Sequence, residues 1–332
     1  MIDDTKAATN QLLNSFRQAQ GDFVSGESLA EQLSVSRVSV KSRIDRLRDI
    51  GYEIEAVRNR GYRLISEPSQ LQPAVLQFEL FTREIPVQVT VLDECSSTND
   101  EAMRALTENL PDPLAVIARR QRSGRGRLGR QWHSEDSGNL MISFGFKPDR
   151  EPAYMQRFTV WTGLRLAECL SSLTGLDVRA KWPNDLLVNR KKLAGILTEA
   201  RMDADRIRDL ILGLGLNINS QVDAWPDEVR AVATSLAHLQ DKTHSMNQVT
   251  AEVVGAVYQA YNAYLDGNID AELDYLWERY SAIDGQTVTI AAPQETVTGE
   301  VIGLDKTGAL RLKLENGSDQ SFSAGDVTLK NW

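Results

Sequence analysis

The first hydrophobic residues of the chain are spaced as they are in short helices. Leu12, Leu13 and Phe16 predict a first helix that ends near Gly21. The stretch 25–33, which starts at Ser25, predicts a second short helix. The chain therefore begins with a small helical region.

A third helix is predicted by Val40, Ile44 and Leu47, which recur at the i, i+4, i+7 spacing of one helical face. Ser36 is a suitable N-cap, and Gly51 is placed to end the helix. A tight turn at 34–35 separates this helix from the second. Two short helices joined by a tight turn, the later one polar and basic on its outer face, are typical of a helix-turn-helix. This motif is predicted at about residues 25–44. The side chains expected to contact DNA are Arg37, Ser39, Ser42, Arg43 and Arg46.

Two short strands, 52–57 and 62–65, follow the third helix. Arg58 and Arg60 lie at the tip of the hairpin between them. Two cations at a hairpin tip suit a wing that rests on DNA phosphates. The alternative is a three-helix module that contacts another protein. Two prolines and polar neighbours in 66–73 then indicate a linker.

The central part of the chain alternates strands and helices. The predicted strands are 87–92, 114–118, 140–146, 193–199 and 210–219, and the predicted helices are 153–173, 249–265 and 271–280. Phe158 and Trp161 are expected to pack in the core rather than to hold a cofactor. From Gly285 onward the pattern changes to short strands with turns at 306–308 and 316–317, which predicts a small SH3-like β barrel.

The predicted fold class is α+β with three domains. These are a winged helix-turn-helix over 1–66, a mixed α/β domain with a largely antiparallel sheet over 67–282, and the β barrel over 283–332. Composition adds little: Cys95 and Cys169 are too few for a disulfide framework, and no apolar run approaches the roughly 18 residues of a membrane helix. We therefore expect a cytoplasmic protein without a membrane partner.

Charge distribution is more informative than the net charge of −9. Residues 37–63 carry eight basic and four acidic side chains, so the predicted helix-turn-helix is locally basic on an acidic protein. A second basic segment, residues 118–132, holds six arginines, three glycines and no acid; we call it the arginine loop. Like charges this dense favour a mobile loop that closes over a phosphate or carboxylate. A solvated basic loop, or one that touches nucleic acid, is the alternative.

The arginine loop formally contains G-x-G-x-x-G, but no helix follows it, which argues against a dinucleotide fold. Other polar candidates lie nearby in the predicted topology. Ser97, Thr98 and Asn99 follow a strand, where they can cap a helix or bind a ligand. Lys181 precedes Trp-Pro and the polar pair 184–185. Glycines alternate in 212–216 and leave room for something close to the sheet.

A P-loop motif is missing from the sequence, and three histidines with two distant cysteines make a protein-bound metal cluster an unattractive hypothesis. Any ATP chemistry would then rely on arginines, lysine and a soluble magnesium ion.

Four segments together resemble the biotin protein ligase family: Gly124-Arg-Gly126-Arg-Leu-Gly129-Arg-Gln-Trp132, Lys181-Trp-Pro-Asn-Asp185, Lys192-Leu-Ala-Gly195-Ile-Leu and the stretch 215–219. The resemblance covers nearly the whole chain. The order of its parts is similar to that of the bifunctional bacterial members, which also repress the biotin operon. Leu128 and Gln131 stand where a second pair of basic residues is common, a difference that bears on how the loop closes.

The resemblance implies that the carboxylate of biotin attacks the α-phosphate of ATP to give biotinyl-5′-AMP. A lysine of the biotin carboxyl-carrier protein of acetyl-CoA carboxylase then takes the biotin. It also implies Mg²⁺, operator DNA as a partner and a homodimer when the adenylate is bound. The implied biotin and adenylate residues are Ser97, Thr98, Asn99, Gln121, Gly124, Arg125, Gly126, Arg127 and Lys181, with Arg125, Arg127 and Lys181 in catalytic roles. Trp132, Asn184 and Asn217 are implied for the ATP side. Apart from the resemblance, Lys330 near the end of the predicted barrel is a possible contact to ATP or the acceptor.

Three alternatives remain open from the sequence. The chain could be a lipoate or octanoate ligase on the same scaffold, a biotin-sensing repressor without catalysis, or a ligase whose N-terminal module no longer binds DNA. The intact arginine loop argues against a mere sensor, because sensing biotin needs no phosphate cradle.

Overall fold

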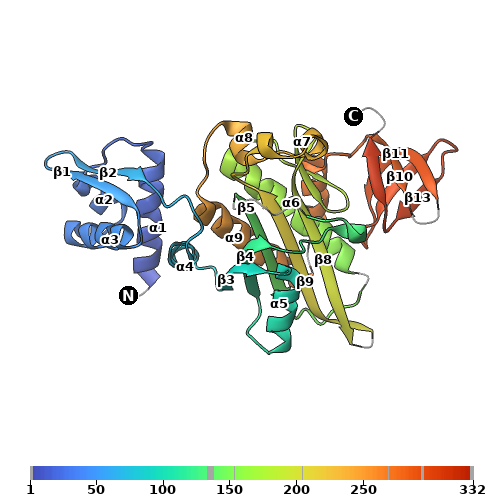
Figure 1. Ribbon diagram of the computed structural model, residues 1–332, viewed down its shortest axis with the longest axis horizontal. Helices are drawn as coiled ribbons and strands as arrows, with labels where there is room; N and C mark the ends of the chain where they lie inside the picture. The colour runs from blue at the N-terminus through green and yellow to red at the C-terminus, as the bar shows by residue number, and fades with distance from the viewer. Residues whose placement is uncertain are drawn as a thin grey trace. The chain divides into compact units, whose positions relative to one another are not determined.

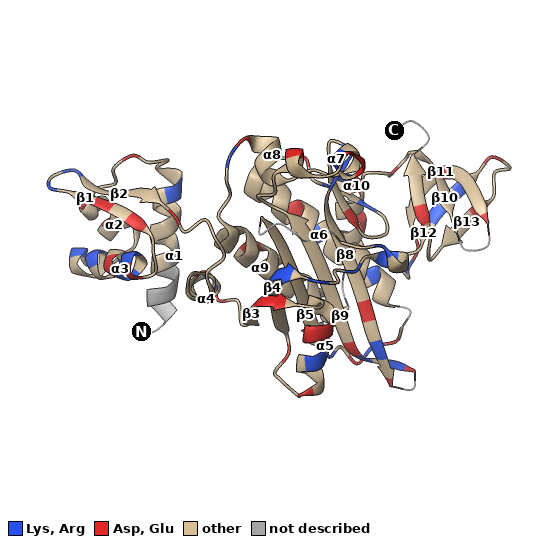
Figure 2. Ribbon diagram, viewed as in Figure 1, with Lys and Arg blue, Asp and Glu red and all other residues tan. Residues whose placement is uncertain are grey.

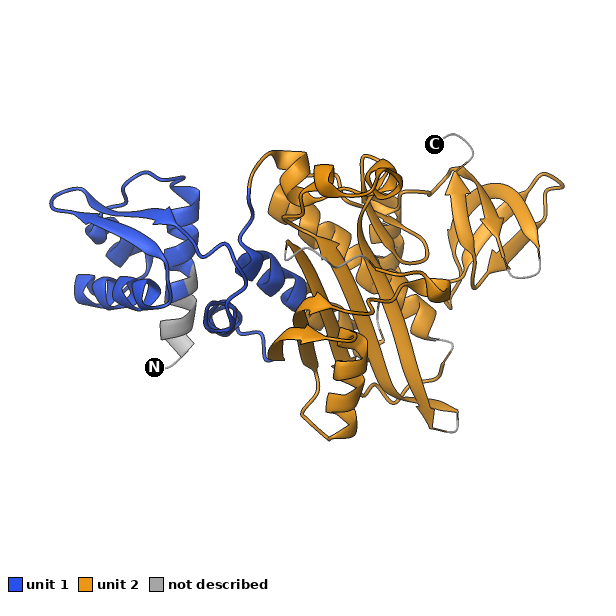
Figure 3. Cartoon of the chain, in the orientation of Figure 1, with its two compact units in different colours: residues 1–86, 243–255 blue, residues 87–242, 256–332 orange. Residues whose placement is uncertain are grey.

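Two compact units make up the chain (Figure 3). The computed structural model describes residues 3–132, 138–152, 154–203, 205–267, 269–292 and 295–329. One unit is Met1–Pro86 with Thr243–Gly255, and the other is Val87–Lys242 with Ala256–Trp332. The boundaries 1–66, 67–282 and 283–332 remain a prediction. No helix in the described ranges is long and apolar enough to cross a membrane.

The first unit begins with a helix-turn-helix and an antiparallel hairpin, as predicted (Figure 1). Ser25 accepts a hydrogen bond from the Ser28 amide at 2.9 Å, and Ser36 accepts one from the Ser39 amide at 3.1 Å. These caps satisfy amides that the first turn of each helix leaves without a partner. The elements are α1 (Asp3–Gln18), α2 (Gly26–Gln32), α3 (Arg37–Asp49), β1 (Glu53–Val57) and β2 (Gly61–Ser66).

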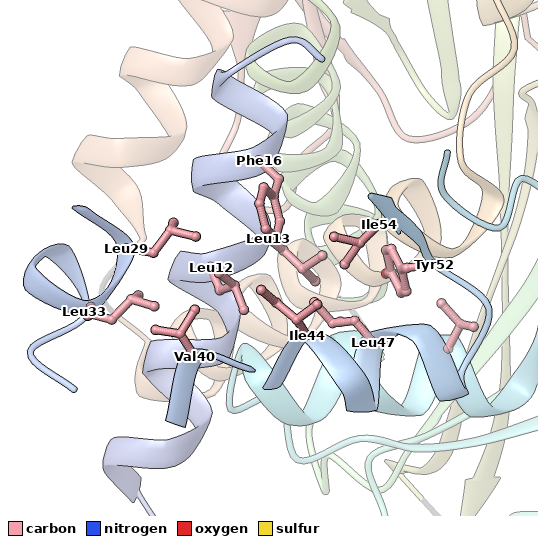
Figure 4. Close-up of a cluster of buried hydrophobic side chains, with 12 residues drawn as sticks. Leu12, Leu13, Phe16, Leu29, Leu33, Val40, Ile44, Leu47, Tyr52 and Ile54 are labelled. Atoms are coloured by element: carbon pink, nitrogen blue, oxygen red, sulfur yellow. The ribbon is translucent and has the colours of Figure 1, made fainter. Parts of the chain in front are cut away.

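Apolar side chains from all three helices form one buried cluster (Figure 4). Leu12, Ile44 and Leu47 are each fully buried, which confirms the predicted inner face of α3. One residue differs from the prediction: Arg43, expected on the outer face, is only 7% exposed. Its guanidinium turns back along α3 and bonds to the carbonyl and hydroxyl oxygens of Ser39.

The predicted linker runs directly into a helix that the sequence did not reveal, α4 (Pro73–Thr82). Pro73 stands at its start, where the missing amide costs nothing. Glu79 on α4 is fully buried and accepts hydrogen bonds from Arg17, Tyr52 and Arg83. This buried cluster joins α4 to α1 and to the residue that precedes β1.

A seven-stranded sheet forms the centre of the second unit, in the order β3-β4-β5-β9-β8-β7-β6. Only β3 and β4 pair in parallel, so the sheet is mixed and largely antiparallel, as predicted. Its strands are β3 (Gln88–Cys95), β4 (Leu114–Gln121), β5 (Asn139–Phe146), β6 (Arg179–Lys181), β7 (Asp185–Val188), β8 (Lys191–Asp203) and β9 (Arg206–Asn217).

Helices cover this sheet. α5 (Thr98–Thr107) packs against β4, β5 and β9, whereas α6 (Tyr154–Thr174) packs against β6, β7 and β8. Phe158 and Trp161 are fully buried, and the Trp161 indole donates to the Ala260 carbonyl at 2.9 Å, so both are core residues as predicted. The other helices are α7 (Asp227–Val232), α8 (Leu236–Gln240), α9 (Met246–Asp266) and α10 (Asp270–Tyr280), with short 3-10 turns η1 (Arg127–Gly129) and η2 (Val222–Ala224).

The C-terminal strands form a five-stranded antiparallel sheet in the order β13-β12-β11-β10-β14. The buried Trp182 indole donates to the Gly308 carbonyl at 3.1 Å, which ties this sheet to the central one. The strands are β10 (Thr287–Ala291), β11 (Thr296–Leu304), β12 (Leu310–Leu314), β13 (Asp319–Phe322) and β14 (Asp326–Leu329). The α+β fold class is thereby confirmed.

Candidate active site

A cleft of about 360 Å³ lies in the second unit, where the arginine loop meets the central sheet. Its lining comes from segments far apart in the sequence: the start of α5, the arginine loop, the β6–β7 turn, β8, β9 and β14. The predicted site residues among its lining are Ser97, Thr98, Asn99, Gln121, Arg125, Gly126, Arg127, Trp132, Lys181 and Asn184.

The three polar residues at the start of α5 are all buried. Ser97 occupies the N-cap position, yet its side chain makes no capping hydrogen bond. The Thr98 amide donates to Gln121 Oε1 at 2.7 Å, and the Thr98 hydroxyl donates to the same oxygen at 3.1 Å. Gln121 therefore satisfies the first amide of α5, and Ser97, whose side chain makes no capping bond, lies in the lining of the cleft.

Asn99 is held from two sides. Its amide nitrogen donates to Glu199 Oε2 at 2.6 Å, and its Oδ1 lies 2.5 Å from the Ser143 hydroxyl. A Cβ on Gly213 of β9 would come within 2.2 Å of the same Oδ1. The glycine thus makes room for the amide close to the sheet, as the alternating glycines suggested.

The aromatic ring of Trp132 occupies the space over a second glycine of β9. A Cβ on Gly215 would lie 2.3 Å from the ring, and one on Gly195 of β8 would lie 3.2 Å from it. The Trp132 Nε1 is buried and finds no hydrogen-bond partner among the residues that the structure describes. The ring and its unsatisfied donor form part of the cleft floor, where a ligand acceptor can satisfy that donor.

The glycine-rich end of the arginine loop folds back on itself as a narrow hairpin. The Gly126 amide donates to the Arg130 carbonyl at 2.6 Å, and the Trp132 amide donates to the Gly124 carbonyl at 2.9 Å. Leu128 at its tip has a left-handed backbone (φ 55°) and is 78% exposed. A Cβ on Gly124 would lie 2.8 Å from the Trp132 carbonyl oxygen, so this glycine allows the close return of the chain.

Each of three arginines in the loop reaches a different part of the second unit. Arg125 forms an ion pair with Asp100 at 2.7 Å and approaches Glu199 at 3.4 Å, and the hydrogen bonds to Asp100 raise its pKa. Arg127 donates to Asn184 Oδ1 at 3.2 Å, and burial lowers its pKa. Arg130 pairs with Asp326. An arginine keeps its charge at any ordinary pH, so the loop brings fixed cations to the cleft.

Two lysines add to these cations. Burial lowers the pKa of the Lys181 amine, and Asp185 opposes that effect. Lys192 forms a 2.7 Å ion pair with Asp185 and lies 5.6 Å from the centroid of the Trp132 ring. Together the cleft combines cations for oxyanions, hydroxyl and amide groups for a neutral polar ligand, and an aromatic surface.

The surface of α3 and the β1–β2 hairpin, the wing, is the candidate DNA interface. Arg58 and Arg60 at the wing tip are exposed, and the Arg60 guanidinium lies 4.2 Å from the centroid of the Phe23 ring. Figure 2 shows basic residues at the tip of the β1–β2 hairpin. Of the residues predicted on α3, Ser39 is half-buried and Arg43 is buried, whereas the exposed ones are Arg37, Ser42 and Arg46. The candidate interface is therefore basic, but the buried guanidinium of Arg43 bonds to Ser39 of the same helix and is not part of the exposed surface.

Comparison with known proteins follows the same division of the chain. Residues 91–217 match the biotin/lipoate A/B protein ligase family, residues 9–63 match a helix-turn-helix domain, and residues 285–330 match the biotin protein ligase C-terminal domain. The bifunctional ligase/repressor BirA of Bacillus subtilis (strain 168) is 33% identical over 318 residues, which cover 96% of this chain and 97% of that protein. The chain belongs to the bifunctional ligase/repressor (BirA) family of biotin protein ligases.

A second curated relative and a solved structure are also similar to this chain. BirA of Escherichia coli (strain K12) is 30% identical over 94% of this chain and 95% of its own length. Among solved structures, the biotin protein ligase from Aquifex aeolicus in complex with biotin and ATP has a TM-score of 0.62 and 26% identity. That match covers 73% of this chain and 98% of the Aquifex chain.

Two residues assigned from the family resemblance lie apart from the lining of this ligase's cleft. Asn217 is buried and its amide donates to the Thr234 carbonyl at 3.0 Å, so it is engaged in the fold. Gly124 shapes the loop backbone. Lys330 lies outside the described residues.

Four further residues line the cleft that sequence patterns did not identify as site residues: Lys192, Asp185, Arg130 and Asp326. The motif that begins at Lys192 could have signalled the first of them. Nothing in the sequence links Arg130 to Asp326, which lies 196 positions away.

Proposed function

We propose that this cleft activates biotin with ATP to biotinyl-5′-AMP and then transfers biotin to a lysine of the biotin carboxyl-carrier protein of acetyl-CoA carboxylase. The observation that carries the proposal is the meeting of the arginine loop, Lys181 and Lys192 with the buried polar start of α5 in one cleft. Membership of the BirA family supports the same chemistry. The similar ligase from Aquifex aeolicus binds biotin and ATP, which are therefore the expected substrates.

In the first step an oxygen of the biotin carboxylate attacks the α-phosphorus of ATP. The bond between that phosphorus and the bridging oxygen breaks, and pyrophosphate leaves. Negative charge builds up on the phosphate oxygens, and fixed cations placed near them lower the barrier. We assign this role to Arg125, Arg127, Lys181 and Lys192. Positioning two anions against each other is also costly, so the same cations screen their repulsion.

In the second step the amine of the acceptor lysine attacks the carbonyl carbon of the mixed anhydride. The carbon–oxygen bond to phosphate breaks, AMP leaves, and the amine loses a proton. Charge again develops on oxygen, so the cations that held the α-phosphate serve this step as well. Arg125 and Arg127 would also cover the adenylate and exclude water between the two steps.

We place the neutral part of biotin against the start of α5, where Ser97, Thr98, Asn99 and Gln121 offer hydroxyl and amide groups. The ring of Trp132 and the Asn184 amide are the candidates for the ATP side. Asn217, bonded to the Thr234 carbonyl, keeps only an indirect role there, in which it supports the end of β9.

Mg²⁺ is expected with ATP. Among the described residues, no group of three histidine, cysteine, aspartate or glutamate side chains is arranged to hold a metal ion. Asp185 and Asp326 in the cleft are both paired with cations. Since Mg²⁺ commonly binds through substrate phosphates and water, the residues fit an ion that is held mainly by ATP itself.

We also propose that the chain represses biotin synthesis genes with biotinyl-5′-AMP as co-repressor. The basic surface of α3 and the wing supports binding to operator DNA. A homodimer that forms when the adenylate is bound would bring two such surfaces to a palindromic operator. The dimer and its operator are hypotheses that rest on this surface and on the relatives' repressor function.

The decisive experiment is ATP–pyrophosphate exchange in the presence of biotin, with no acid, lipoate or octanoate as controls. Exchange that needs biotin is expected. Exchange with lipoate or octanoate instead would keep the mechanism and overturn the substrate. Biotin binding without any exchange would mean a biotin-sensing repressor that does not catalyse.

A further inference from the structure

The outward face of α3 contains one side chain that stability does not explain. Val38 is 79% exposed, the most exposed large apolar residue in the described part of the chain. A β-branched residue is a mediocre helix former, and an exposed one gains nothing from packing. Its neighbours along the helix are polar or charged, so a valine here calls for another reason.

The position of Val38 on the helix is informative. At 3.6 residues per turn, it lies opposite the face that Val40, Ile44 and Leu47 bury. Ser42 follows one turn later on the same outward line and is also exposed. The centre of the outward face is therefore uncharged in its first two turns, with a methyl-bearing side chain followed by a hydroxyl.

Cations flank this uncharged line on both sides. Arg37 and Lys41 lie on one side of it and Arg46 on the other, and all three are exposed. A helix in the major groove has this requirement: flanking cations reach the two phosphate backbones while the central residues face the base edges. Figure 2 shows that basic residues recur along α3.

The buried guanidinium of Arg43 narrows the choice of base-reading residues further. It bonds to both the carbonyl and the hydroxyl oxygen of Ser39, so that hydroxyl is engaged inside the helix. Among the residues of these two turns, Val38 and Ser42 are left to face the bases. A valine can offer only apolar contact, and the major-groove group that accepts such contact is the C5 methyl of thymine.

We infer that Val38 reads the methyl group of one thymine in each half-site of the operator, with Ser42 contacting the adjacent base pair. This inference rests on the proposed repressor function and deepens it, because it names what the recognition helix selects. Burial of one methyl group against another is worth roughly a fivefold difference in affinity.

The test starts from duplexes that the full-length protein, saturated with biotinyl-5′-AMP, enriches from a pool of random sequence. In the enriched duplex each thymine is replaced singly by uracil, which removes only the methyl group. We expect uracil at one position per half-site to weaken binding about fivefold and uracil elsewhere to change little. The Val38→Ser variant, which has no methyl group at this position, should bind the thymine duplex about fivefold more weakly and be indifferent to uracil at that position.

Val232→Ser is the matched control, because Val232 is an exposed helical valine (62%) of α7 in the other unit. It should bind as the unmodified protein does and keep the same uracil sensitivity. Amide hydrogen exchange at α1 and α3, unchanged from the unmodified protein, establishes that the first unit of Val38→Ser is folded. Equal binding of every uracil duplex by the unmodified protein, or undiminished uracil sensitivity in Val38→Ser, would overturn the inference alone. Failure to enrich any sequence would overturn the repressor function and the inference with it.

Discussion

At the scale of single residues, the geometry of the cleft depends on side chains whose positions are fixed by the residues they contact. Asn99 is fixed by Glu199 and Ser143 and can approach the sheet only because position 213 lacks a side chain. Thr98 is fixed by Gln121, which accepts hydrogen bonds from its amide and its hydroxyl. Small changes behind the site should therefore affect activity more than stability.

Gly213→Ala tests this dependence. The added Cβ would lie 2.2 Å from Asn99 Oδ1, so the amide must move out of its place. We expect biotin-dependent exchange to fall at least about tenfold, which corresponds to about 1.4 kcal/mol in the barrier. Gly163→Ala in α6 is the control: its nearest atom is Ile196 Cδ1 at 3.5 Å, and alanine is the better helix former. Full activity of Gly213→Ala would show that the position of Asn99 does not matter.

The buried lysine gives a prediction about pH. Burial lowers the pKa of Lys181, so this amine loses its proton at a lower pH than an exposed lysine, whose pKa is about 10.4. If its charge holds an oxyanion, the rate of biotin adenylation should decline on the alkaline side below that value. Lys181→Arg keeps the charge and should shift the decline to higher pH.

Lys191→Arg is a suitable control, because the Lys191 amine donates to the Arg230 carbonyl and the residue does not line the cleft. An active Lys181→Arg protein with an unchanged alkaline profile would assign the decline to another group.

At the scale of helices and strands, local patterns were sufficient for much of the fold and insufficient for the rest. The inner face of α3, its cap at Ser36 and the wing follow from spacing within a few residues, and all are confirmed. Helix α4 was missed because its residues 73–82 are mostly apolar, with no clear polar face, and follow a proline-rich linker. The prediction for Arg43 was wrong because periodicity gives only the direction in which a side chain leaves the helix. The long side chain of Arg43 folds back along the helix to Ser39.

The candidate site shows the same limit. The arginine loop was predicted from composition, since six cations without an acid need an anion nearby. Its pairing with Asp100 and Asp326 depends on how distant segments meet, which no local pattern encodes. Lys192 lay in a quoted motif, but its role at the cleft appears only when β8 is placed beside the loop.

The buried cluster around α4 gives a prediction about stability. Burial would raise the pKa of the Glu79 carboxyl, but Arg17 and Arg83 outweigh it and hold that pKa below its ordinary value. Glu79→Gln leaves these arginines without their buried counter-charge, which should cost about 3 kcal/mol or more in the stability of the first unit. Urea unfolding, with hydrogen exchange read at α1 and α4, measures this loss.

The same shift fixes the sign of the acid response. Because the folded pKa of Glu79 is depressed, its contribution to stability is present above the ordinary carboxyl value and is lost as the pH falls through the folded one. Glu79→Gln should lack this part of the acid sensitivity. Glu67→Gln, which also touches Arg17 but at a partly exposed carboxylate, should cost much less. Equal losses in the two variants would refute a special role for the buried carboxylate.

At the scale of the whole molecule, the two proposed functions lie in different compact units. If the adenylate strengthens DNA binding, linkage requires that operator DNA strengthen adenylate binding by the same factor. The arginine loop is the natural link on the ligase side, because its ordering around the adenylate would change the surface that a second subunit meets.

Arg125→Ala should therefore weaken two properties together. Removing this cation deprives the adenylate of a partner near the start of α5, so its release should accelerate, by about tenfold if the lost charge-assisted contact is worth 1.4 kcal/mol. Adenylate-promoted DNA binding should fall in parallel at limiting ligand. Release can be followed by competition with unlabelled adenylate, and DNA binding by titration of a duplex selected from a random pool. Arg206→Ala removes the same charge from an exposed pair with Asp149 outside the cleft lining and should change neither property. Normal repression by an Arg125→Ala protein that no longer retains adenylate would contradict the coupling, because the co-repressor would then act without the loop that is proposed to report its presence.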